Sequence, residues 1–110
     1  MGRRIETKWD IPYSIVKIVV MICADYDRRR IAIDLANESD TVITEYVRLN
    51  QIVDGAMSAI EEGVQRVFLD DVSLGRGYDF SPASPFLAKN TYYQRKRKFV
   101  HDVAKGLQLI

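Results

Sequence analysis

The chain contains one cysteine, one histidine and no apolar run of membrane-spanning length. The lone Cys23 has no partner for an intrachain disulfide, and its place inside an apolar run predicts a buried, reduced thiol. The longest apolar stretch, residues 11–24, is interrupted by Lys17 and is shorter than the about 20 residues that cross a bilayer. It lacks the small-residue cleavage site of a secretory signal, and three arginines follow it. The sequence therefore predicts a cytoplasmic protein that is not associated with a membrane.

The scarcity of histidine limits the chemistry that the chain can perform. With His101 alone, histidine-rich zinc sites are excluded, and neither a Ser–His–Asp nor a Cys–His arrangement is favoured. The acidic pairs at 61–62 and 70–71 are neighbours on expected helices, where adjacent side chains point in different directions, so they indicate solvated surface rather than a magnesium site. The Gly-Arg-Gly at 75–77 lacks the third glycine of a nucleotide-binding loop and predicts a turn. We expect no enzyme, no metal and no cofactor.

Charge is nearly balanced overall but is unevenly distributed along the chain. Sixteen basic and fifteen acidic residues give a net charge of +1. Residues 31–75 hold nine acids against two bases, whereas residues 80–101 hold five bases and no acid. An acidic middle and a basic C-terminal quarter predict a local attraction for a polyanion.

The length and the apolar spacing predict a single all-α domain, residues 1–110, of about four to five helices. A chain of 110 residues with 47% hydrophobic and 28% charged residues has the size and composition of one globular domain. We expect the first helix to run from Asp10, as its N-cap, to about Leu35, with Pro12 in the first turn. The β-branched run at 15–20 also fits a strand, but the apolar pattern lasts longer than a strand does.

Two more helices and a turn-rich segment are expected next. Ser39 or Asp40 caps a second helix, whose apolar stripe predicts packing on the first helix, with a dimer seam as the alternative. The stripe consists of Val42, Tyr46, Leu49, Val53, Met57 and Ile60. A third helix is expected from Glu62 to Asp71, with Phe68 buried. The Ser-Pro pairs at 81–82 and 84–85 predict short helical turns.

The last helix is expected to begin near Asn90 or Thr91 and to end at about Lys105. Its apolar face opposes a face that is basic at its start. This pattern is typical of a DNA recognition helix, whose first residues meet base edges while lysines and arginines neutralise phosphates. Gln94 suits adenine and Arg95 suits guanine. A basic, solvated surface without a partner is the alternative.

The C-terminal residues resemble a known family. Thr-Tyr-Tyr-Gln-Arg-Lys-Arg-Lys-Phe at 91–99, followed by Ala104 and Leu-Gln-Leu-Ile at 107–110, is similar to the signature of the RinA/ArpU-like late transcription activators of phages and prophages of Gram-positive bacteria. Those proteins are similar to region 4 of bacterial sigma factors. The resemblance implies a helix-turn-helix-like reader in a DNA-binding part at about 78–110, an N-terminal helical part at about 10–71, and a bacterial host cytoplasm. The segment before Thr91 departs from the family pattern, because it holds Pro82 and Pro85.

These features together predict a sequence-specific, duplex-DNA-binding transcription regulator, an activator of phage or prophage late genes. The expected DNA-contacting residues are Lys89, Asn90, Thr91, Tyr92, Gln94, Arg95, Lys96, Arg97, Lys98 and His101. The alternative is a non-catalytic protein–protein interaction module that binds RNA polymerase or another phage protein through the acidic middle of the chain.

Overall fold

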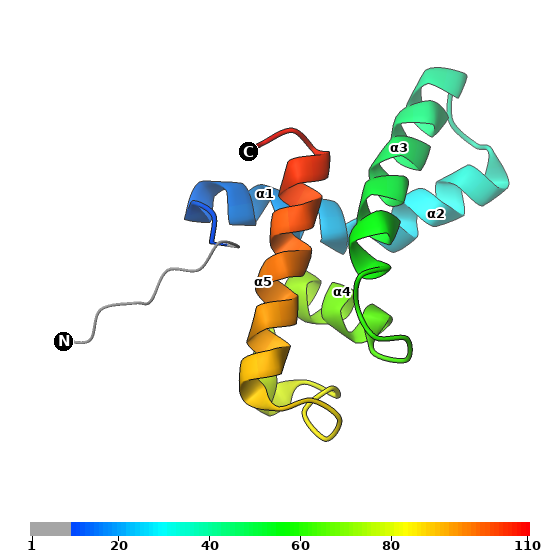
Figure 1. The fold of residues 1–110 in the computed structure, drawn as a ribbon. Coiled ribbons are helices and arrows are strands. Elements are labelled where there is room, and N and C mark those ends of the chain that lie inside the picture. Colours follow the sequence, from blue (N-terminus) through cyan, green and yellow to red (C-terminus); the bar gives the residue numbers. More distant parts are fainter. Residues whose placement is uncertain (1–9) are drawn as a thin grey trace.

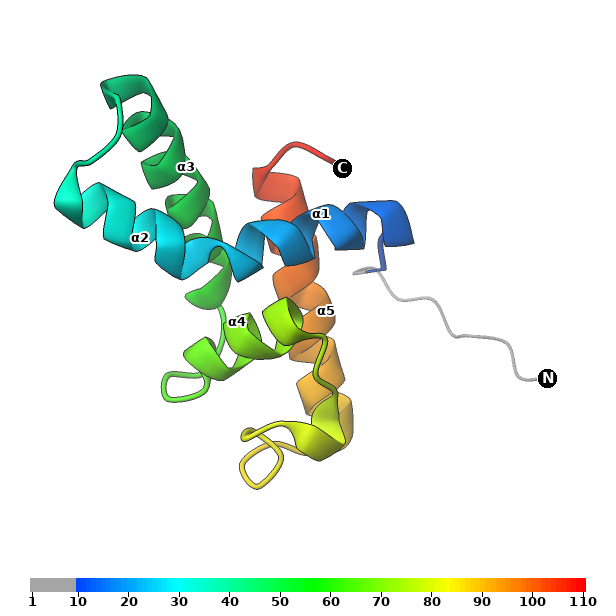
Figure 2. The same ribbon diagram turned by 180° about the vertical axis from the view of Figure 1, so that it is seen from behind.

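The computed structural model describes residues 10–110, which form five α-helices and one short 3₁₀ helix (Figures 1 and 2). In chain order these are α1 (Tyr13–Ala24), α2 (Tyr26–Leu35), α3 (Asp40–Met57), α4 (Gln65–Leu74), η1 (Tyr78–Phe80) and α5 (Lys89–Gly106). The described residues contain no strand, so the all-α fold class is confirmed and the strand alternative at 15–20 is wrong. No helix between residues 10 and 110 is long and apolar enough to cross a bilayer.

The expected single first helix is two helices that follow one another across the molecule (Figure 2). Pro12, and not Asp10, occupies the N-cap position of α1. The helix is interrupted at Asp25, whose carboxylate accepts hydrogen bonds from the guanidinium of Arg28. The next arginine, Arg29, turns inward, donates from Nη2 to the carbonyl of Ile22 at 2.6 Å and is almost fully buried. The prediction of one continuous helix was therefore wrong. The polar contacts of Arg28 and Arg29 accompany the break, and a periodic apolar pattern does not predict such contacts.

α2 and the first half of α3 form an arm that extends from the rest of the molecule (Figure 1). Ser39 caps α3, as expected, since its Oγ accepts the amide N–H of Val42 at 3.4 Å. The arm is joined by a buried polar contact in which Arg29 Nε donates to Asn50 Oδ1 at 2.7 Å. The Cα atoms extend over 51 × 29 × 20 Å, which reflects this elongated shape.

The core lies where α1, α3, α4 and α5 meet. Its largest fully buried apolar side chains are Tyr92, Phe68, Phe99, Leu69, Val19, Val53 and Val103. Of the predicted stripe, only the C-terminal part reaches this core: Val53 on α3 and Ile60, three residues after the end of α3, are buried there, whereas Leu49 is half-buried on α3. Cys23 is buried and free, as predicted.

The helix expected at 62–71 is α4, which begins three residues later, at Gln65, and ends at Leu74; Gly75 follows it in the left-handed conformation. Residues 75–88 then lead to α5 and contain η1 and a series of turns, so the expectation of short turns around the Ser-Pro pairs is confirmed. A helix-turn-helix joins its two helices by a turn of about three to four residues. The connection between α4 and α5 is much longer, and a regular helix-turn-helix is not formed at this place.

Candidate nucleic-acid interface

One long face of α5 is left uncovered by the other helices. α1, α3 and α4 pack against α5, which lies in front of α1 and α4 in Figure 1 and behind them in Figure 2. On the uncovered side, residues that recur every three or four positions form one line along the helix. We call this line the outer face of α5; its residues are Asn90, Gln94, Lys98, His101 and Lys105, of which Asn90, Gln94 and Lys105 are exposed, Lys98 is half-buried and the His101 side chain is 18% exposed. The buried side carries Tyr92, Phe99, Val100, Val103 and Ala104.

Tyr92 fixes the rotation of α5 about its own axis. Its ring is fully buried and stacks on Phe68 of α4 with a centroid distance of 5.1 Å. Its hydroxyl donates to Oδ2 of Asp71 at 2.7 Å, and Oδ1 of that fully buried carboxylate accepts from Arg76 Nε at 2.6 Å. Burial and the neighbouring carboxylate raise the pKa of Tyr92, so the hydroxyl keeps the proton that it donates. Tyr92 was expected to contact DNA; its buried side chain instead anchors α5 to α4.

Two neighbouring tyrosines hold residues 75–88 against the start of α5. The hydroxyl of Tyr93 accepts the backbone N–H of Tyr78 at 3.2 Å. The hydroxyl of Tyr78 lies 2.7 Å from the carbonyl of Leu87 and 3.0 Å from that of Ser84. Leu87 comes just before the helix, so these contacts set where the first turn of α5 lies.

The basic residues of α5 are mostly engaged with other groups of the chain. Arg95 Nε lies 2.6 Å from Glu61 Oε1, and Lys98 Nζ lies 2.6 Å from Asp102 Oδ2. These ion pairs are partly solvated, and pairs of this kind contribute only about 0–1 kcal/mol, so a phosphate can replace the carboxylate at small cost. Lys89 is exposed and has no ion pair with any residue in the range 10–110.

Lys96 points away from the outer face, whereas Arg97, three residues after Gln94 and four before His101, lies at its edge. Lys96 Nζ donates to the carbonyl of Arg76 at 2.7 Å and lies 5.8 Å from the ring centre of Tyr92. Burial lowers its pKa. Arg97 Nε lies 3.8 Å from Asp10 Oδ1, at the start of the described chain. Of the predicted DNA contacts, Lys96 and Tyr92 therefore lie on other sides of α5, and Arg97 is partly engaged with Asp10.

The N-terminal half of the outer face carries two exposed amides, Asn90 and Gln94, one helical turn apart. Thr91 is half-buried beside them. The first turn of α5 has no acidic residue, and Ala88 at the N-cap provides no side-chain hydrogen bond. The first N–H groups of the helix and the positive end of its dipole are consequently available to an anion.

The C-terminal half of the outer face adds His101 and Lys105. His101 Nδ1 lies 3.3 Å from Asp102 Oδ1. Lys105 is exposed and was missed by the sequence prediction, although it lies four residues after His101 on the same line. The spacing alone could have found it. Asp71 was dismissed as solvated surface and is buried, because its partner Tyr92 is distant in sequence.

No protein-family model, no curated protein and no solved structure matches this chain. Within residues 10–110 no group of three or more histidine, cysteine, aspartate or glutamate side chains is placed to hold a metal ion. The function of the outer face is therefore inferred from its own chemistry.

Proposed function

We propose that this chain binds duplex DNA by placing the outer face of α5 in the major groove. One observation carries the proposal: two exposed amides, Asn90 and Gln94, are followed along the outer face of α5 by Lys98, His101 and Lys105, and Asp102, which pairs with Lys98, is the single acid of the helix. α5 has 18 residues and is thus about 27 Å long, and the major groove of B-DNA is wide enough to admit an α-helix.

The residue types suit the two kinds of contact that DNA recognition needs. Asn90 and Gln94 can each donate to and accept from an adenine edge at the same time. Lys89, Lys98 and Lys105 are placed along the helix to neutralise phosphates, which positions the protein without reading sequence. Arg95 joins them when it exchanges Glu61 for a phosphate.

The biological role that fits this activity is transcription regulation. The resemblance of residues 91–110 to phage late activators favours an activator of phage or prophage late genes in a bacterial cytoplasm. Its reader is then a single long helix that is held by the turns of residues 75–88 and by Tyr92.

A second candidate function is a protein–protein interaction module, favoured by the arm. Ile31 and Leu35 lie one turn apart on α2 and are 54% and 67% exposed, and acidic residues such as Asp34 and Glu38 lie close to them in the chain. An apolar strip near carboxylates suits a partner with a basic, apolar helix, for example a subunit of RNA polymerase.

The test begins with selection of a preferred site from a random duplex pool, followed by fluorescence anisotropy titrations at several salt concentrations. Three lysine–phosphate contacts predict a slope of log affinity against log salt of about −2.7. Gln94→Ala should cost about 1–3 kcal/mol on the preferred site and relax its base preference. Lys105→Gln should weaken binding to all duplexes alike and reduce the slope by about 0.9.

The matched control is Arg30→Gln, which removes the same charge from the exposed surface of α2 and should leave DNA affinity unchanged. A slope near zero, or unchanged binding after Gln94 and Lys105 are both replaced, would exclude the outer face as a DNA reader. Retained polymerase binding by that double variant, with loss of binding by Leu35→Asp, would support the interaction module instead.

A further inference from the structure

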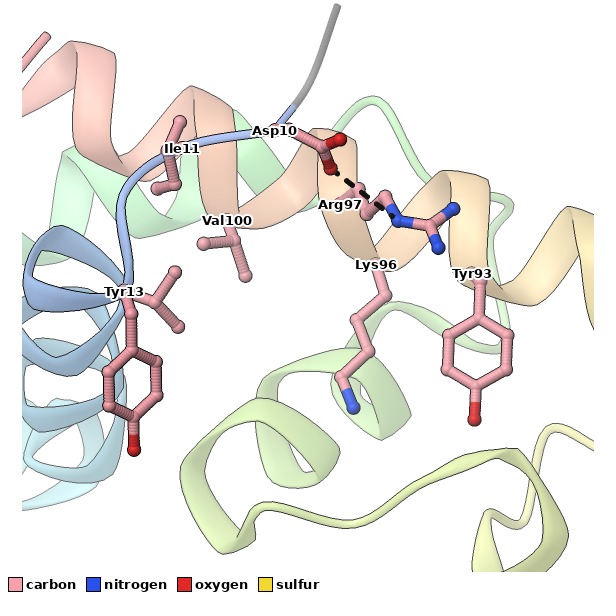
Figure 3. Close-up of a pocket in the computed structure, with 8 residues that line it drawn as sticks. Asp10, Ile11, Tyr13, Tyr93, Lys96, Arg97 and Val100 are labelled. Carbon is pink, nitrogen blue, oxygen red and sulfur yellow. Dashed lines mark ion pairs between the residues drawn. The ribbon is translucent and has the colours of Figure 1, made fainter. Parts of the chain in front are cut away.

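A pocket of about 310 Å³ lies between the start of α1 and the middle of α5 (Figure 3). The side chains of Ile11, Val16 and Val100 and the rings of Tyr13 and Tyr93 form its walls. Its volume is at the lower end of the range of about 300–1,000 Å³ that is usual for small-molecule sites, which are mostly apolar with a few placed polar groups.

Two cationic side chains of α5 line the same pocket. In Figure 3 Lys96 extends into the space between Tyr13 and Tyr93, and Arg97 lies beside Asp10 at the rim. The ammonium of Lys96 has three N–H groups and uses one on the carbonyl of Arg76, so two remain for a ligand. The guanidinium of Arg97 has five N–H groups, and its nearest contact with Asp10 is a loose 3.8 Å from Nε.

The lining therefore has an excess of positive charge next to apolar and aromatic surface. Asp10 is the single acid among the described residues that line the pocket. Burial already lowers the pKa of Lys96, because water no longer solvates its charge fully. An anion in the pocket would supply the favourable interaction that the solvent does not.

We propose that this pocket binds a small organic anion that joins a carboxylate to a flat apolar body. The carboxylate is received by Lys96 and Arg97, and the flat body lies between the tyrosine rings and the aliphatic side chains. An inorganic anion is too small to cover the apolar walls, and a neutral apolar molecule makes no ionic contact with the two cations, which have only the carboxylate of Asp10 in the described lining. No part of this proposal depends on DNA binding.

Isothermal titration calorimetry on the full chain, without DNA, compares three probes. Indole-3-acetate has both features, indole-3-acetamide keeps the flat body but lacks the charge, and inorganic phosphate keeps the charge but lacks the body. We expect saturable 1:1 binding of indole-3-acetate, and binding of the amide and of phosphate that is at least about tenfold weaker, a difference of about 1.4 kcal/mol. In ¹H–¹⁵N spectra the amides of Tyr93, Arg97 and Val100 should shift on titration.

Variants test the geometry. Arg97→Gln, at a partly exposed position, should weaken the binding of indole-3-acetate at least about tenfold, because a charge-assisted hydrogen bond is lost. Arg30→Gln removes the same charge far from the pocket and should leave the affinity unchanged. Lys96→Met keeps the aliphatic stem and should weaken binding like Arg97→Gln. Equal affinity for the acid and its amide, equal weakening by Arg30→Gln and Arg97→Gln, or no saturable binding would each overturn the proposal.

Discussion

Replacing Tyr92 by phenylalanine tests how α5 is held in place, because the change removes one hydroxyl and keeps the ring. The ring contacts with Phe68, Tyr78 and Tyr93, at centroid distances of 5.1, 5.4 and 5.1 Å, remain available to phenylalanine. What is lost is the 2.7 Å hydrogen bond to the fully buried carboxylate of Asp71, together with a longer 3.3 Å contact to the carbonyl of Arg76. A hydrogen bond to a charged group contributes about 1.5–3 kcal/mol. Since Arg76 still pairs with Asp71, we expect a loss of about 2 kcal/mol in the free energy of unfolding.

Urea denaturation followed by circular dichroism measures this loss, with an unchanged m-value as evidence that the same surface is exposed on unfolding. The matched control is Tyr13→Phe, which removes a hydroxyl from an exposed ring and should change stability by less than about 0.5 kcal/mol. If Tyr92→Phe also costs less than about 0.5 kcal/mol, the bond to Asp71 does not anchor the helix. The folded variant should keep the base preference of the parent chain, whereas a direct DNA contact through the Tyr92 hydroxyl would alter it.

Three further predictions concern packing, the thiol and acid stability. A Cβ on Gly106 would lie 2.6 Å from Cγ2 of Ile52, so Gly106→Ala should destabilise the fold by about 1 kcal/mol or more, as measured in a thermal melt. A Cβ on Gly55, inside α3, would meet nothing within 4 Å, so Gly55→Ala should stabilise the fold by about 0.5–1 kcal/mol. If both substitutions changed stability in the same direction, the close packing of Gly106 on Ile52 would be contradicted. Burial raises the pKa of Cys23 to about 12, so a thiol reagent at pH 8 should label the native chain far more slowly than the denatured chain. Equal labelling rates for the native and the denatured chain would show that the thiol is accessible. The Arg66 guanidinium lowers the pKa of Asp27 below its ordinary value. The stability that this pair contributes is therefore present above about pH 4 and is lost as the pH falls through the lowered pKa. Asp27→Asn should reduce this loss of stability at low pH, and an unchanged pH dependence would exclude the pair as its cause.

The parts of the fold that depend on local pattern could be predicted from the sequence. The apolar spacing on α3 and the amphipathic spacing on α5 give helices close to the observed ones, and Ser39 caps α3 as expected. These features follow from the helical period and from capping chemistry within a few residues. The face of α5 that carries Gln94 and Lys98 could be assigned for the same reason.

The parts that depend on distant partners could not be predicted. The three consecutive arginines form a basic run in the sequence, but Arg29 is buried against Asn50, which lies 21 residues away. A buried guanidinium is favourable only where its donors find acceptors, and those acceptors come from α1 and α3. The interruption between α1 and α2 at Asp25 occurs next to this buried arginine, and a periodic apolar pattern does not predict it.

The same limit applies to the candidate site, where charge counted along the sequence overstates what the surface presents. Arg95 is paired with Glu61, which follows α3, and Lys96 is turned inward to the carbonyl of Arg76. A count of basic residues therefore predicts a steeper salt dependence than the geometry does, and the measured slope separates the two interpretations.

The aromatic pair at 92–93 has a structural role that follows from helical geometry. Consecutive helical residues are about 100° apart, so Tyr92 can enter the core while Tyr93 reaches the connection that precedes the helix. Together they fix the rotation and the axial position of α5, and this leaves Asn90 and Gln94 on the uncovered side. If α5 reads DNA, the pair determines which side chains face the bases without touching them. Substitutions at 92 and 93 should then change stability and affinity together, while substitutions at 90 and 94 should change sequence preference at unchanged stability. If substitutions at 92 and 93 instead changed sequence preference at unchanged stability, the tyrosines themselves would read the DNA, and the buried position of Tyr92 would not be the DNA-bound one.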